Sequence, residues 1–194
     1  MTFSPRRRRS AAAEPPDPDG TGGQGEQHAD PESFARSIAL RLLTGAPRSR
    51  HQLADAMARR GVEEQVAEKV LDRFTEVGLI DDAEYARMLV RSQRESRSLA
   101  RRALAVELRR RGIGDEDAAA ALADVDSEAE EEAARELLRR RWRSGPGLDP
   151  QVQSRRAVAM LARKGYSPGL SAKLVREMVD DRGSEPWDPT GSAD

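Results

Sequence analysis

The stretch Gly78-Leu79-Ile80-Asp81-Asp82-Ala83-Glu84-Tyr85-Ala86 closes one helical segment and opens the next. Gly78 follows an apolar run of helical period, where a left-handed C-terminal cap is favoured. Asp81 precedes Glu84 by three residues, which is the spacing of a helix-starting capping box. The acids could instead mark a metal or catalytic site, but capping accounts for both. We expect a structural joint with Leu79 and Ile80 buried between two units. Its residues are Gly78, Leu79, Ile80, Asp81, Asp82 and Tyr85.

The features of this stretch recur along the chain. Gly61, Gly112 and Gly165 each follow an apolar helical run, and they lie 51 and 53 residues apart. Four positions before each glycine stands a large apolar residue. These residues are Met57, Leu108 and Leu161. Matches at fixed offsets argue for tandem units of about 50 residues, in which each glycine follows the middle helix.

The predicted fold is all-α, with nine helices in three tandem three-helix repeats that form an elongated, curved body. Ser49 and Ser98 are expected to cap the middle helices of the first two units. Both ends of the chain contain few large apolar residues and are expected to be disordered tails. The expected divisions are a tail at 1–30, units at 31–80, 81–125 and 126–182, and a tail at 183–194.

The composition agrees with a helical protein. Of 194 residues, 35% are charged and only 4% are aromatic. There is no cysteine, which excludes disulfides and thiolate chemistry. No apolar run approaches the ~20 residues of a membrane span, and no secretory signal follows the run Arg6 to Arg9. We expect a cytoplasmic protein without membrane contact.

Candidate catalytic groups are few. His28 falls in the expected N-terminal tail, and His51 stands alone at a helix start, where a functional role is uncommon. The acids between Glu128 and Glu132 could hold a metal, but they coincide with a first helical turn, where acids suit the helix dipole. No phosphate-binding glycine loop and no metal-ligand spacing occurs. We expect no enzymatic activity, no cofactor and no metal.

The net charge of -1 conceals a basic central region, since residues 33–182 carry 29 bases against 25 acids. Eight arginines and two acids lie between Arg91 and Arg111. A guanidinium can bind phosphate or carboxylate through two bonds, so we expect a filament or nucleic-acid interface here. A merely solvated face is the alternative, as it is for Arg6 to Arg9. The candidate interface residues are Arg91, Arg94, Arg97, Arg101, Arg102, Arg109, Arg110, Arg111, Arg139, Arg140, Arg141, Arg143, Arg155 and Arg156.

Several short motifs together resemble those of the RecX family of regulatory proteins. They are Ile38-Ala-Leu-Arg41-Leu-Leu43, Arg48-Ser49, Gly78-Leu-Ile-Asp81-Asp82 with Tyr85-Ala86, Glu107-Leu108-Arg-Arg-Arg-Gly112-Ile113, and Leu161-Ala-Arg-Lys-Gly165-Tyr166. Each motif is short, but their order and spacing are specific. The resemblance covers residues 34–181, and the threefold repeat agrees with the architecture of that family.

The resemblance implies a non-enzymatic regulator of the RecA recombinase, active in DNA recombination, DNA repair and the SOS response. Family members bind in the groove of the RecA–DNA filament and inhibit strand exchange and ATP hydrolysis. The expected partner is this filament, with single- or double-stranded DNA as a further candidate, and the chain is expected to be a monomer. Capping of filament growth and filament disassembly both remain compatible with it.

The alternative is a direct DNA-binding helical protein of the transcription-factor type, because three-helix units can present a recognition helix. Two of the candidate recognition helices begin with acids, at Glu63 to Glu68 and at Asp115 to Asp117. Such acids repel phosphate, which counts against direct base reading by these helices.

Overall fold

The computed structural model describes residues 30–142 and 149–183, and within these ranges its regular elements are nine α-helices without a strand. The helices are α1 (Pro31–Gly45), α2 (Arg50–Ala58), α3 (Glu64–Glu76), α4 (Asp82–Arg97), α5 (Arg101–Arg110), α6 (Asp115–Ala121), α7 (Ser127–Arg141), α8 (Pro150–Lys164) and α9 (Pro168–Gly183). The predicted all-α class is confirmed. The predicted tails, 1–30 and 183–194, lie outside the described ranges except for Asp30, which caps α1, and Gly183, which ends α9. Among the described helices, none has the length and apolarity needed to cross a membrane.

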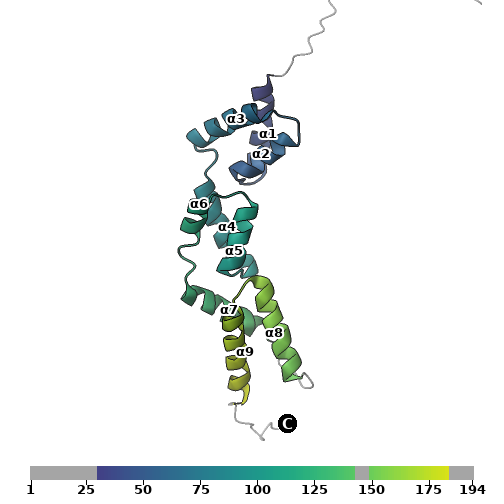
Figure 1. The fold of residues 1–194 in the computed structure, drawn as a ribbon, viewed down its shortest axis with the longest axis vertical. Coiled ribbons are helices and arrows are strands. Elements are labelled where there is room, and N and C mark those ends of the chain that lie inside the picture. Colours follow the sequence, from purple (N-terminus) through teal and green to yellow (C-terminus); the bar gives the residue numbers. More distant parts are fainter. Residues whose placement is uncertain (1–29, 143–148, 184–194) are drawn as a thin grey trace, which may run out of the picture.

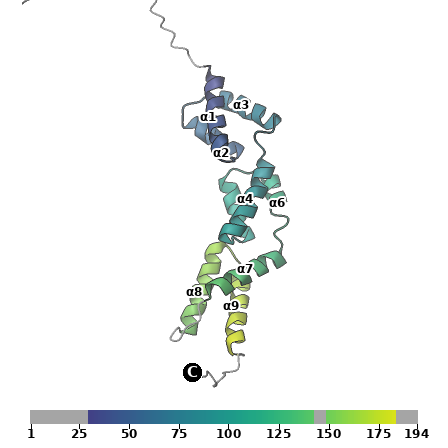
Figure 2. The ribbon, with the colours of Figure 1, turned by 180° about the vertical axis from the view of Figure 1, so that it is seen from behind.

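The helices group in threes along the long axis of the molecule, as Figures 1 and 2 show from opposite sides. Helices α1–α3, α4–α6 and α7–α9 each enclose a hydrophobic core of their own. The prediction of three tandem three-helix units in an elongated body is therefore confirmed. We refer to them as the first, second and third unit.

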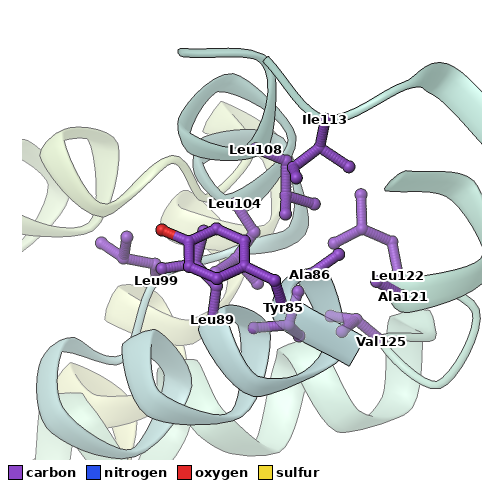
Figure 3. Packing of buried hydrophobic residues seen from close by; sticks show 11 residues of the cluster. Tyr85, Ala86, Leu89, Leu99, Leu104, Leu108, Ile113, Ala121, Leu122 and Val125 are labelled. Carbon is purple, nitrogen blue, oxygen red and sulfur yellow. The ribbon is translucent and has the colours of Figure 1, made fainter. Parts of the chain in front are cut away.

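The core of the second unit illustrates how each triplet closes (Figure 3). Leu104 and Leu108 of α5 are completely buried against α4 and the segment around α6. The ring of Tyr85 lies among these aliphatic side chains, and its hydroxyl points away from Leu122 and Ala121. A buried phenol needs a hydrogen-bond partner, so this hydroxyl directs Tyr85 toward the boundary of the unit.

The glycines of the repeat end the middle helices as predicted. Gly61, Gly112 and Gly165 follow α2, α5 and α8 with φ of 76°, 70° and 92°, and Gly78 has φ of 72° after α3. Glycine adopts this left-handed conformation without steric cost, so a glycine is favoured where each helix ends and the chain changes direction. Ser49 forms a complete capping box with Gln52 at the start of α2.

Two details of the helix ends differ from the prediction. Ser98 does not cap α5; it ends α4 with φ of 49°, and α5 begins after Ala100 without a side-chain cap. Asp81 caps α4 as predicted, but the Glu84 carboxylate bonds Arg87 and Arg91. Arginines one and two turns along the same helix hold this carboxylate, as expected for charges spaced by three or seven residues.

The expectation that Leu79 is buried is wrong, because 49% of its surface is exposed. Ile80 is only 3% exposed and packs into the core of the first unit. The N–H groups of Leu79 and Ile80 both donate to the Phe74 carbonyl, so this turn folds back on the end of α3, and only Ile80 enters the core.

Candidate functional site

The first joint, between the first and second units, is built from polar contacts at the start of α2. The backbone N–H of Arg50 donates to the Asp82 carboxylate at 2.9 Å, and Ser49 Oγ donates to the Arg111 carbonyl at 2.5 Å. The Tyr85 hydroxyl bonds Gln52 Oε1 at 3.2 Å and accepts from Arg111 Nη1 at 2.6 Å. Burial raises the pKa of Asp82, while the bond from Arg50 lowers it. Several of these polar groups are partly buried, so a donor left without an acceptor would destabilise the joint.

The second joint, between the second and third units, has the same plan. The N–H of Ala100 donates to the Lys164 carbonyl at 2.9 Å, and Lys164 Nζ donates to the Arg97 carbonyl at 2.6 Å. The N–H of Arg101 donates to Glu130 at 3.2 Å, and Tyr166 Oη donates to the Ser98 carbonyl at 3.1 Å. Lys164 and Tyr166 thereby fasten the third unit to the end of α4.

The two joints share two features. In each, the first residue of a middle helix (Arg50 or Arg101) donates its N–H to an acid from the next unit. In each, the glycine of the next unit faces that same helix: a Cβ on Gly112 would overlap His51, and one on Gly165 would lie 2.7 Å from Ala103 Cβ. The glycines are recognisable from the sequence, whereas these partners are not. The repeat offset of 51 residues, which aligns Arg50 with Arg101, was the signal that could have indicated them.

Two candidate interface arginines have structural roles. The Arg101 guanidinium donates to the carbonyls of Leu122 and Val125, where α6 ends. Arg111 bonds Tyr85 and, through Nη2, Glu107 at 2.8 Å. Arg101 is exposed like Arg102, but part of its guanidinium already bonds the end of another helix.

Several further candidates form exposed pairs. Arg91 contacts Glu84, Arg110 contacts Glu107, and Arg139 and Arg140 contact Glu136. The Arg155 guanidinium bonds the Gln151 carbonyl of its own helix. Exposed pairs of this kind contribute little to stability, so these arginines can exchange partners. Arg143 lies outside the described residues.

Within the described ranges, eight candidates make no side-chain ion pair, and two of these, Arg101 and Arg155, bond backbone carbonyls instead. The other six are Arg94, Arg97, Arg102, Arg109, Arg141 and Arg156. All but the half-buried Arg94 are exposed. A guanidinium without an ion pair keeps most of its five N–H donors for a ligand, although Arg97 already donates one to Gln93 Oε1 at 3.3 Å.

The second joint brings together arginines from separate parts of the chain. Burial lowers the pKa of Lys164, and the charges of Arg97 and Arg141 lower it further. Burial also raises the pKa of Tyr166 to about 12, against the opposing influence of Arg94 and Arg140. These effects place the C-terminal turns of α4 and α7 at one location, where Arg140 also bonds Ser98 Oγ at 3.2 Å. Arg155 and Arg156 lie about two turns before Lys164 along α8 and are not part of this cluster.

The cluster of Arg94, Arg97, Arg140, Arg141 and Lys164, the joint cluster, is suited to bind anions. Its charges come from three helix ends, and of the five only Arg140 forms an ion pair with a described residue, Glu136. Among the described residues no group of histidines and acids could hold a metal ion. Phosphate or carboxylate is thus the ligand chemistry that the arrangement favours.

Comparisons with known proteins agree with the threefold architecture. Models of the first, second and third three-helix domains of RecX match residues 35–74, 81–122 and 128–175. The chain belongs to the RecX family. The resemblance identified from the short motifs is thereby confirmed.

Relatives named regulatory protein RecX match most of this RecX-family chain. The protein from Thermobifida fusca (strain YX) is 52% identical over 171 residues, which cover 86% of the chain and 92% of the relative. The protein from Streptomyces lividans is 48% identical over 162 residues, covering 84% and 86%. The protein from Mycolicibacterium smegmatis is 41% identical over 191 residues, covering 94% and 97%.

Solved structures share the fold. A RecX crystal structure from Lactobacillus salivarius superposes with a TM-score of 0.64 at 21% identity, covering 78% of the chain and 98% of that structure. A crystal structure of a regulatory protein RecX superposes with a TM-score of 0.61 at 28% identity, covering 79% and 73%.

Proposed function

We propose that this RecX-family chain is a non-enzymatic, monomeric regulator that binds the RecA–DNA filament in the cytoplasm and inhibits its recombinase and ATPase activities. The match to all three RecX domains carries this proposal, since relatives that align over most of the chain are named regulatory proteins. Through the filament, the chain would modulate recombination, DNA repair and the SOS response.

The shape and charge of the molecule support this role. Three units in a row can contact successive protomers of a filament, so that weak contacts combine into strong overall binding. The arginines outside the structural bonds supply the ionic part of each contact. The proposed interface contains Arg91, Arg94, Arg97, Arg102, Arg109, Arg110, Arg139, Arg140, Arg141, Arg155 and Arg156.

Direct DNA binding is the competing function, because the same arginines suit phosphate. The third helices of the first two units argue against base reading. Helix α6 begins with Asp115, Glu116 and Asp117, and α3 has Glu64 in its first turn. An acidic helix start is repelled by the phosphates that flank the major groove.

Sedimentation separates the two functions. The purified chain is centrifuged with RecA assembled on single-stranded DNA, with DNA alone and with RecA alone, at rising salt. We expect the chain to pellet with the filament at salt concentrations that abolish pelleting with bare DNA, since DNA binding by phosphate contacts alone falls steeply with salt. Equal pelleting with bare DNA at every salt concentration would favour the direct DNA-binding protein.

A further inference from the structure

A cleft of about 380 Å³ lies beside α4, between the second and third units. Helix α4 supplies one wall, with Arg87, Arg91 and Arg94 on it. Side chains of the α6–α7 region line the rest, and they include the buried Val125. The volume falls in the range of small-ligand sites, and the cleft is open enough for an extended chain segment to enter.

The three arginines of the cleft differ in whether they already form an ion pair within the protein. Glu84 holds Arg87 through Nε at 2.9 Å and Arg91 through Nη2 at 3.3 Å, which leaves each guanidinium with further donors. Arg94, one turn further along α4, makes no ion pair with any residue that the structure describes. A carboxylate entering the cleft would therefore meet Arg94 first, with no internal pair to displace.

The remaining lining favours a peptide over a nucleic-acid strand. None of the described residues that line the cleft is aromatic, so a base would have no ring to stack on. Val90 and Val125 instead provide an aliphatic floor that suits a side chain such as leucine or valine. Glu95 and Asp124 also line the cleft, and they repel the successive charges of a nucleic-acid strand at every nucleotide. A peptide can place a single carboxylate on Arg94 and donate its uncharged N–H groups to these acids.

We propose that this cleft binds an acidic peptide segment of the protein partner, with one carboxylate on Arg94 and a neighbouring aliphatic side chain on the valine floor. The inference rests on the proposed function in so far as the partner is the filament protein. It assigns a protein contact to α4, distinct from any contact between the other arginines and DNA.

The test uses two fluorescein-labelled probes: a peptide of alternating aspartate and leucine, and a single-stranded oligothymidine. A peptide with asparagine in place of aspartate is the control probe. Arg94→Ala is compared with Arg36→Ala, which removes the same charge from an exposed position on α1, outside the proposed interface. Circular dichroism confirms the fold of both variants.

We expect the wild type to bind the acidic peptide and Arg94→Ala to bind it at least about tenfold more weakly, because a charge-assisted bond is lost. Arg36→Ala should bind the peptide like the wild type, the asparagine peptide should bind weakly, and oligothymidine binding should change equally in both variants. Absence of peptide binding by the wild type, equal peptide binding by wild type and Arg94→Ala, or a selective loss of oligothymidine binding in Arg94→Ala would each overturn the proposal.

Inhibition of filament ATP hydrolysis is measured in parallel and reports on the proposed function alone. Peptide binding of the expected pattern without inhibition supports the cleft and removes the proposed function. Inhibition by a wild type that does not bind the peptide removes the cleft and leaves the proposed function intact.

Discussion

Gly112 and Gly61 share a left-handed backbone but differ in their surroundings. A Cβ on Gly61 would meet open space, whereas one on Gly112 would overlap His51 across the first joint. We expect Gly61→Ala to lower the free energy of unfolding by about 1–2 kcal/mol, the cost of the left-handed conformation for a residue with a Cβ. Gly112→Ala should lower it by about 1–3 kcal/mol more, because the two units must also shift apart. Urea unfolding of both variants measures the difference, and equal losses would show that Gly112 has no role in the joint.

The Asp82 carboxylate accepts a hydrogen bond from the Arg50 N–H, but its negative charge is partly buried. Its pKa is raised by burial, and Asp117 and Asp81 raise it further. The folded state therefore binds this proton more tightly than the unfolded state, so the favourable contribution of Asp82 is complete at low pH and is lost as pH rises through its raised pKa. Asp82→Asn keeps an oxygen for the Arg50 N–H and removes the charge.

We expect Asp82→Asn to be at least as stable as the wild type at neutral pH, with this advantage shrinking toward about pH 4. Asp82→Ala should lose about 1 kcal/mol at neutral pH, because the start of α2 then lacks its acceptor. Urea unfolding across this pH range gives both differences. An advantage of the asparagine variant that grows as pH falls would contradict the assigned sign.

Arg101 and Arg102 are adjacent at the start of α5, but their guanidinium groups make different contacts. Arg101 bonds the carbonyls that end α6, whereas Arg102 is exposed and makes no ion pair with a described residue. We expect Arg101→Ala to lower the free energy of unfolding by about 1–2 kcal/mol through loss of charge-assisted bonds. Arg102→Ala should change it by less than about 0.5 kcal/mol. Similar unfolding curves for the two variants would show that the Arg101 bonds do not support α6.

The helices and their ends could be predicted from the sequence because their signals are local. Glycine at position 78 predicts the turn after α3, and aspartate at position 81 predicts the cap of α4. The spacing of apolar residues predicts the three cores. The joints could not be predicted in the same way, because the partners of Asp82 and Tyr85 lie more than 25 residues away. Composition alone likewise did not separate the structural Arg101 from the solvated Arg102.

The whole molecule is a short array in which equivalent joints set each unit on the next. The third unit departs from the pattern, since α8 begins with Pro150 where α2 and α5 begin with Arg50 and Arg101. Proline has no backbone N–H to donate, so α8 cannot form the same joint with a further unit. Within the described chain, this type of joint therefore occurs twice, at the starts of α2 and α5.

The joint cluster and the arginines beside it carry the proposed regulation. Arg94, Arg97 and Arg102 make no ion pair in the part of the chain that the structure describes. Replacing all three by glutamine removes three charges while keeping side-chain length and helix propensity. Arg36, Arg41 and Arg59 of the first unit are exposed, and their triple glutamine variant, which removes the same number of charges, is the control.

The rate of RecA-dependent ATP hydrolysis on single-stranded DNA tests the central claim most directly. We predict that the wild-type chain slows hydrolysis at near-stoichiometric ratios and less so at higher salt, because the exposed ionic contacts are screened. The variant lacking Arg94, Arg97 and Arg102 should need at least about tenfold more protein for the same inhibition, while the control variant inhibits like the wild type. Undiminished inhibition by the folded first variant would contradict the arginine interface, and no inhibition by the wild type would contradict the proposed regulation of the filament.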